Sequence, residues 1–203
     1  MPMISLRKAS PRDLFWSFAR AEFEIPEHGL RHTQPQISPE LRRRVMLDRR
    51  DTFSDRDLVS LRDALLSTRS DLVQPLLELD IEWLHGQLQS TKWEKLRFID
   101  LRIFTEIVPD RSLGELAAAL DGGAVPRGWD PSRYLSLRSE FEPDRMHGLP
   151  VVVSERPAGP YTLIEGVTRM CALISKVRRG ELDVFRIPFL LGVSPRIGSR
   201  EFY

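Results

Sequence analysis

The sequence predicts a protein of the α/β (α+β) class, with a helical N-terminal region over about residues 1–90 and a mixed-sheet domain over residues 91–203. Apolar residues recur at helical spacing through the first ninety residues, and runs of branched and aromatic residues appear after them. Gly and Pro separate these segments. With 41% hydrophobic and 29% charged residues, the chain of 203 residues can bury a core.

Helix start signals mark the N-terminal region. A Ser followed by Pro or Asp in the first turn occurs at Ser10, Ser38 and Ser54, and an apolar stripe follows each one, as at the start of an α-helix. A fourth helix is expected to begin near Asp71 or Pro75. Its buried face would consist of apolar residues at helical spacing: Leu77, Ile81, Leu84 and Leu88.

Strands are expected in the second half, together with the helices that cover them. Residues 96–104 are rich in branched and aromatic side chains and predict a strand. Ser112 begins a capping box and a helix that ends at the two glycines 122 and 123, and Asp130-Pro131 opens a further short helix. The remaining elements are strands over residues 149–153, 161–165 and 186–191, with a helix from about Thr168 to Gly180.

Composition excludes several classes of protein. The formal net charge is +1 and neither half of the chain has a marked basic excess, so a protein that coats nucleic acid is not expected. Cys171 is the single cysteine, which rules out an internal disulfide, and neither it nor the four histidines predict a metal site. Without a signal-peptide pattern or a membrane-length apolar run, the sequence predicts a soluble cytoplasmic protein.

The turn Glu165-Gly166-Val167-Thr168-Arg169 is the strongest candidate for a functional site. A strand ends there and a helix begins at once, so unpaired N–H groups and the helix dipole favour an anion. Gly166 would let a ligand approach the backbone, Thr168 would cap the helix or donate its hydroxyl, and Arg169 offers a planar fork. We predict a phosphate site at Gly166, Val167, Thr168 and Arg169, with an exposed Arg169 that adds little to stability.

Residues 96–193 resemble the ParB/sulfiredoxin-like superfamily. Leu149–Val153 is similar to the first strand of that core, and Tyr161–Met170 to its second strand, its acidic-Gly-x-x-Arg turn and the start of its helix. The resemblance implies that the turn binds a nucleotide or a phosphorylated small molecule through Gly166 and Arg169. The implied cofactor is a nucleoside di- or triphosphate with Mg²⁺, and the implied chemistry, if any, is phosphoryl transfer or phosphate-ester hydrolysis.

Members of this superfamily include partition proteins that use a cytidine nucleotide, sulfiredoxins that use ATP, and kinases of free serine. Sulfiredoxins have a reactive Cys after the Gly and a His after that, where this chain has Val167 and Thr168. Sulfiredoxin activity is therefore not expected. Cys171 lies beyond the turn and is interpreted as a small buried residue rather than a nucleophile.

Glu165 occupies the acidic position of the turn, and two roles are open for it. It would pin the turn by accepting N–H bonds, which is the favoured interpretation, or act as a catalytic base near a bound phosphoacceptor. The sequence therefore leaves open whether the protein is an enzyme.

The alternative function is that of a non-catalytic ParB-like module that recognises a protein or DNA partner through helices of residues 38–66. This segment has several arginines, but nearby acidic residues offset them, so a solvated helix face is favoured over a nucleic-acid site. An exposed apolar or basic patch on this segment would support the alternative. A buried ion pair between Arg169 and Glu165 would support it too, because the turn would then be a structural joint.

Overall fold

The structure, a computed structural model, describes residues 7–23, 37–140, 148–184 and 186–199. Its centre is a six-stranded mixed sheet in the order β1-β2-β6-β4-β5-β3. β4 is parallel to β6 and β3 is parallel to β5, whereas the other neighbours are antiparallel. The predicted α/β class is therefore confirmed. The strands are β1 (Arg7–Lys8), β2 (Glu82–Gln89), β3 (Arg97–Phe98), β4 (Val151–Ser154), β5 (Thr162–Glu165) and β6 (Arg186–Val193).

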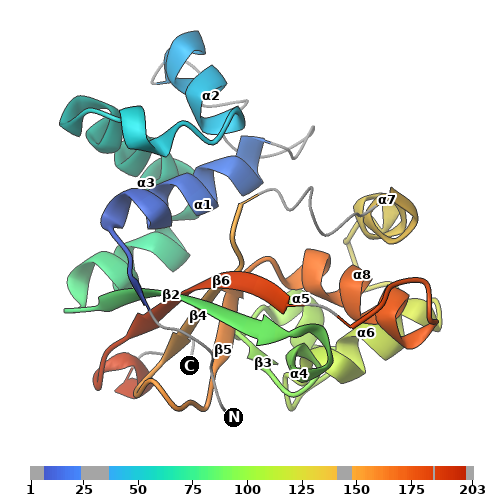
Figure 1. Ribbon diagram of the computed structural model, residues 1–203. Coiled ribbons are helices and arrows are strands. Elements are labelled where there is room, and N and C mark those ends of the chain that lie inside the picture. The colour runs from blue at the N-terminus through green and yellow to red at the C-terminus, as the bar shows by residue number, and fades with distance from the viewer. Residues whose placement is uncertain (1–6, 24–36, 141–147, 185, 200–203) are drawn as a thin grey trace.

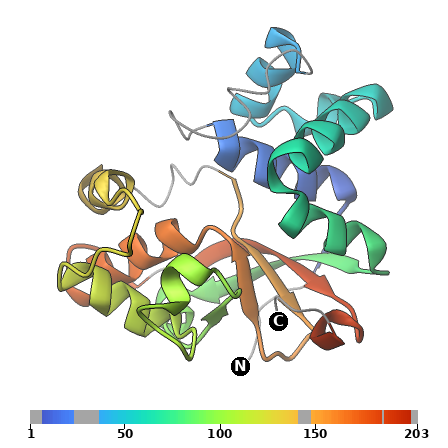
Figure 2. The same cartoon turned by 180° about the vertical axis from the view of Figure 1, so that it is seen from behind.

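The longer helices form two groups. α1, α2 and α3 lie together, and α6, α7 and α8 gather separately (Figure 1); the view from behind shows the same separation (Figure 2). The helices are α1 (Pro11–Phe23), α2 (Pro39–Met46), α3 (Asp55–Glu78), α4 (Ser90–Trp93), α5 (Arg102–Thr105), α6 (Leu113–Asp121), α7 (Ser132–Glu140) and α8 (Val167–Arg178), with 3-10 turns η2 (Arg50–Thr52) and η4 (Ile197–Ser199).

Side chains that alternate along the strands divide the buried core into two clusters. In β4, Val151 and Val153 pack in the cluster that contains the apolar residues of α1, α2 and α3. Val152, between them, packs in the cluster of α6 and α8. Because successive side chains of a strand point to opposite faces, the two helix groups cover opposite faces of the sheet.

Serine caps begin the helices where the sequence predicts them. Ser38, Ser54 and Ser112 each accept a hydrogen bond from the backbone N–H three residues later, at the start of α2, α3 and α6. α3 continues to Glu78 but has a kink at Arg69, where φ is −137° and ψ is 36°. This kink separates the third and fourth helices that the sequence predicts.

The prediction of one helical face from Leu77 to Leu88 is wrong. α3 ends at Glu78, and β2 pairs with β6 along its whole length. Residues 84 and 88 are four apart, a spacing that places them on one face of a strand as well as of a helix, so the apolar pattern does not distinguish the two. β1 and β2 thereby bring part of the first ninety residues into the sheet.

The strand expected over residues 96–104 is also too long. Only β3 pairs, in parallel with β5, and the chain then turns into α5. In this conformation Phe104 packs edge-on against Phe98, with ring centroids 6.2 Å apart. The aromatic residues that favoured a long strand therefore contact each other across a turn.

Two glycines of the sheet each face an aromatic ring on the neighbouring strand. Gly86 of β2 lies opposite Phe189 of β6, and Trp83 of β2 lies opposite Gly192 of β6. A Cβ at Gly86 would lie 2.7 Å from the Phe189 ring, and one at Gly192 would lie 2.8 Å from the Trp83 ring. Both rings therefore pack directly on a bare backbone.

Candidate functional site

The turn between β5 and α8 has the predicted backbone geometry. β5 ends at Glu165, Gly166 is left-handed with φ of 98°, and α8 begins at Val167. A positive φ strains a residue that has a Cβ, which accounts for the glycine. The N-cap residue of α8, Gly166, has no side chain that could cap the helix, whereas Ser38 caps α2. Val167 points into the core and Thr168 is half-buried.

Arg169 is buried, so the prediction of an exposed arginine is wrong. Its side chain is 3% exposed. Nη1 donates to the carbonyl oxygen of Gly148 at 2.8 Å, and Nη2 lies 3.5 Å from Oε1 of Glu165. Side chains in a helix tilt towards its N-terminus, which brings the guanidinium back over the turn. A Cβ at Gly166 would lie 3.1 Å from Nη2, so Gly166 also makes room for Arg169 itself.

Both carboxylate oxygens of Glu165 face arginines. Oε1 faces Arg169, and Oε2 lies 3.5 Å from Nη2 of Arg69, at the kink of α3. Nη1 of Arg69 lies 2.8 Å from Oε1 of Glu22, in α1. Glu22, Arg69, Glu165 and Arg169, which we call the charge row, alternate in sign and join α1, α3, the end of β5 and α8. This position suits Glu165 to pin the turn, through contacts with arginines rather than with the N–H groups expected.

The sequence of the turn indicates Glu165 and Arg169 as site residues, but it does not indicate Glu22 or Arg69. The contact between Arg69 and Glu165 spans 96 residues, and no local pattern reports such a contact. One signal was available for Glu22: it follows Phe15 and Phe18 at helical spacing, so it lies on the apolar face of α1. A charged residue on an apolar face predicts a buried partner of opposite charge.

The environment of Glu22 disfavours its charge. Burial raises the pKa of this carboxyl group, and the neighbouring negative charge of Glu165 adds to the rise. The positive charges of Arg69 and Arg133 oppose the rise without cancelling it. Among the groups near Glu22, whose side chain is 3% exposed, Arg69 does most to favour the ionised form.

A second polar cluster joins α6, α7 and α8. Oδ1 of Asp121 accepts hydrogen bonds from Oγ of Ser175 at 2.7 Å and from the hydroxyl of Tyr134 at 2.8 Å. Burial opposes ionisation of Asp121, but these hydrogen bonds outweigh it and lower its pKa. Nearby, Cys171 is fully buried, and burial raises the pKa of its thiol. The structure thus agrees with the interpretation of Cys171 as an unreactive buried residue.

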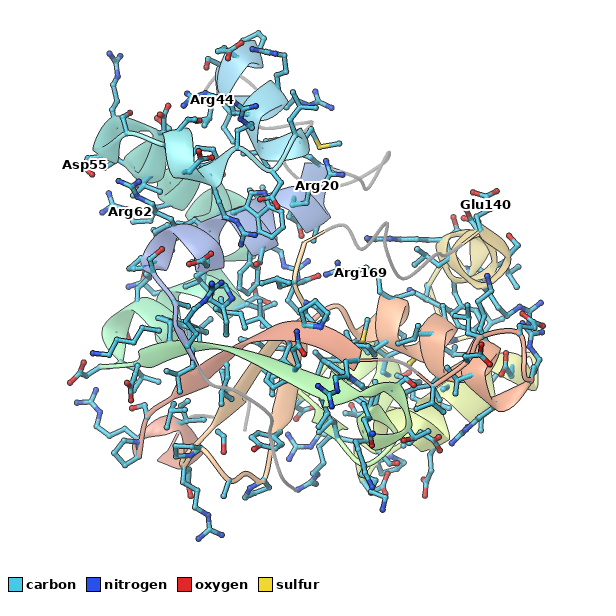
Figure 3. The ribbon with its side chains drawn as sticks, viewed as in Figure 1. Arg20, Arg44, Asp55, Arg62, Glu140 and Arg169 are labelled. Atoms are coloured by element: carbon cyan, nitrogen blue, oxygen red, sulfur yellow. The ribbon has the colours of Figure 1, made fainter. Side chains whose placement is uncertain are left out.

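The segment of residues 38–66 presents balanced charges and isolated apolar residues. Leu47 and Val59 are 58% and 45% exposed. Figure 3 places Arg44 and Arg62 on the α2 and α3 side of the molecule, away from Arg169. Ion pairs in this segment include Arg43–Glu40 at 3.0 Å, Arg44–Asp57 at 2.9 Å and Arg62–Asp63 at 2.8 Å.

Across the described residues, no helix has the length and apolar character needed to span a membrane. The same residues contain no group of three or more His, Cys, Asp or Glu side chains placed to hold a metal ion; His28, His32 and His147 lie outside them. The chain matched none of the family models, curated proteins or solved structures with which it was compared.

Proposed function

We propose that this chain is a non-catalytic module, ParB-like in the sequence of its turn, that recognises a protein partner through residues 38–66. The observation that carries the proposal is the internal pairing of Arg169 with Glu165 and Gly148. An arginine that binds a ligand phosphate must present its guanidinium to the ligand. Removing a buried charge from its partner costs about 3–5 kcal/mol, so a ligand at this turn would first have to offset that energy.

Residues 38–66 support recognition of a protein rather than of DNA. Binding to DNA depends on Lys and Arg side chains that neutralise phosphates, whereas Arg43, Arg44 and Arg62 contact carboxylates of this chain. A protein interface commonly has an apolar centre and a polar, charged rim. Leu47 and Val59 are the exposed apolar residues of this segment, and we expect them to lie in the interface.

The test is capture of a partner from a lysate by the parent chain and by variants. Leu47→Glu and Val59→Glu should each abolish capture of the partner, since a charge without a counterpart destabilises an apolar contact. The matched controls are Val125→Glu and Val184→Glu, which alter similarly exposed residues outside the segment and should leave capture intact. Equal capture by all four variants would overturn the proposed interface, and capture lost on nuclease treatment would indicate nucleic acid instead.

A second candidate is binding of a nucleotide or phosphorylated small molecule at the turn. It is favoured by the left-handed Gly166, which serves as the N-cap of α8 without a capping side chain, and by the dipole at the start of that helix. The ligand would replace Glu165 as the partner of Arg169 and would accept N–H bonds from residues 167–169. Phosphoryl transfer or phosphate-ester hydrolysis belongs to this candidate, with Glu165, released from Arg169, as the base.

A thermal-shift screen against nucleoside di- and triphosphates, with and without Mg²⁺, tests this candidate. A ligand at a hundred times its Kd stabilises the folded state by about 2.7 kcal/mol. The Tm of the parent protein should therefore rise when the nucleotide is added, and the Tm of Arg169→Met should rise much less. No shift with any nucleotide would leave the partner-binding module as the function. Release of inorganic phosphate by parent protein but not by Glu165→Gln would instead establish an enzyme.

A further inference from the structure

We infer that the charge row is a coupling device: the pairing of Arg169 at the turn determines how firmly α1 and α3 are held together. This inference deepens the proposed function, because residues 38–66, through which the chain would bind its partner, lie in α2 and the first part of α3, and α1 packs against both helices. A change in the partner of Arg169, at the turn between β5 and α8, would thereby alter the packing beneath residues 38–66.

Each link of the row is a direct contact, and the row has two fixed ends. At one end Arg169 is held by the Gly148 carbonyl at 2.8 Å. At the other, Glu22 is buried in α1 and contacts Arg69 at 2.8 Å. Between them, the two links to Glu165 are both 3.5 Å long. The contacts of Glu165 are therefore the longest in the row, so an exchange of its partner needs the least movement.

Arg69 is shared between two carboxylates. Nη1 contacts Glu22 and Nη2 contacts Glu165. If Arg169 is removed or takes another partner, Glu165 keeps Arg69 as its only contact in the row. The attraction between Glu165 and Arg69 then increases, since no second cation offsets the carboxylate, and Arg69 is drawn away from Glu22. The ion pair between Glu22 of α1 and Arg69 of α3 therefore weakens. Within the charge row, Arg169 affects this pair only through Glu165.

The backbone of α3 allows this shift. Arg69 lies at the kink, with φ of −137° and ψ of 36°. Just before it, the hydroxyl groups of Ser67 and Thr68 donate to the carbonyl of Ala64 at 2.7 Å and 3.2 Å. Such back-bonding bends helices. The two halves of α3 are therefore joined at the residue that carries the shared guanidinium.

Hydrogen exchange resolved by residue tests the coupling in the intact chain. In Arg169→Met, amides of residues 19–23 of α1 and 70–76 of α3 should exchange about tenfold faster, a change of about 1.4 kcal/mol, whereas those of α6 should change less than about twofold. Glu165→Gln is the second variant, and its expected effect has the opposite sign. It removes the carboxylate that competes with Glu22 for Arg69, so exchange in the same residues of α1 and α3 should slow or stay unchanged, and acceleration there would overturn the inference. The matched control is Arg178→Met, which removes another α8 arginine that contacts a glutamate, Glu94, at 2.9 Å.

The outcomes separate the coupling from its alternatives. The inference would be overturned if Arg169→Met left the hydrogen-exchange rates in α1 and α3 unchanged, or accelerated exchange in α6 by the same factor. It would also be overturned if Arg178→Met accelerated exchange in α1 and α3 as much as Arg169→Met does. Pyrophosphate added to the parent protein tests the turn by a different route: faster exchange in α1 and α3 would support both the coupling and the phosphate candidate. If pyrophosphate has no effect while Arg169→Met does, the coupling stands and phosphate binding fails. Failure of the Leu47 and Val59 variants to reduce capture would overturn the partner surface alone.

Discussion

Replacing Arg169 with methionine measures what the turn contributes to stability. Methionine keeps most of the side-chain volume and removes the guanidinium, so the change isolates the polar contacts. The hydrogen bond to Gly148 is short, 2.8 Å, and a bond from a charged donor contributes about 1.5–3 kcal/mol. The contact with Glu165 is longer, 3.5 Å, but it is buried, and breaking a buried ion pair costs about 3–5 kcal/mol.

Because Arg69 still faces Glu165 in this variant, we expect a loss at the lower end of that range. The free energy of unfolding should fall by about 3 kcal/mol, and the Tm by about 6–12 °C for a chain of this size. Urea denaturation followed by circular dichroism measures the first quantity, and a thermal scan measures the second. A loss below about 1 kcal/mol, the value for an exposed pair, would refute the structural role of Arg169.

Arg178→Met is the control for burial. Arg178 also lies in α8, donates to a glycine carbonyl, that of Gly114, at 3.0 Å, and pairs with Glu94 at 2.9 Å. Its side chain is 35% exposed, so its removal should cost about 1 kcal/mol or less. Equal losses from the two variants would mean that burial does not determine the contribution of Arg169.

The other predictions concern backbone strain, protonation and the second cluster. Gly166→Ala should lower the free energy of unfolding by about 1–2 kcal/mol, because a left-handed residue with a Cβ is strained; an unchanged Tm would contradict this. The raised pKa of Glu22 means that the folded state holds this proton more tightly than the unfolded state. As pH rises above 4.5, the ordinary value, the parent should therefore lose stability relative to Glu22→Gln, until the pH passes the folded-state pKa. Urea denaturation from about pH 4 to about pH 7 measures this difference, and a constant or opposite trend would be evidence against it. Tyr134→Phe should lower the free energy of unfolding by about 1.5–3 kcal/mol, measured in urea, since it removes a hydrogen bond to ionised Asp121; a neutral effect would show that the hydroxyl is dispensable. Cys171→Ser should still capture the partner, and complete loss of capture by a folded variant would contradict an unreactive role.

Local signals predicted the elements that local interactions determine. The serine caps of α2, α3 and α6 depend on residues three apart. The glycine between β5 and α8 is needed for its own left-handed backbone conformation. The sequence predicts a helix where β2 forms, because the strand that pairs with it, β6, lies about a hundred residues further along the chain. Leu84 and Leu88 fit both periods, and only pairing with β6 selects the strand.

At the candidate site, too, the sequence predicts the features that depend on neighbouring residues and not those that depend on distant ones. The position of the turn and the need for glycine follow from the sequence around residue 166, but the burial of Arg169 does not. Its buried side chain donates to Gly148, which is 21 residues away in the sequence, and Glu165, which it faces, also contacts Arg69, 96 residues away. A pattern of neighbouring residues predicts that an anion suits Arg169, and it cannot predict that Glu165 within the same chain takes that place.

The facing glycines and aromatic rings of β2 and β6 have a consequence for related sequences. Phe189 fits only where the opposite residue is Gly86, and Trp83 only where it is Gly192. A shift of β2 by one residue relative to β6 would place the Phe189 and Trp83 rings opposite residues with side chains. The two pairs therefore both fix the register of β2 and β6. Substitutions at these positions should therefore occur together: a side chain at residue 192 requires a smaller residue at 83, and one at residue 86 requires a smaller residue at 189.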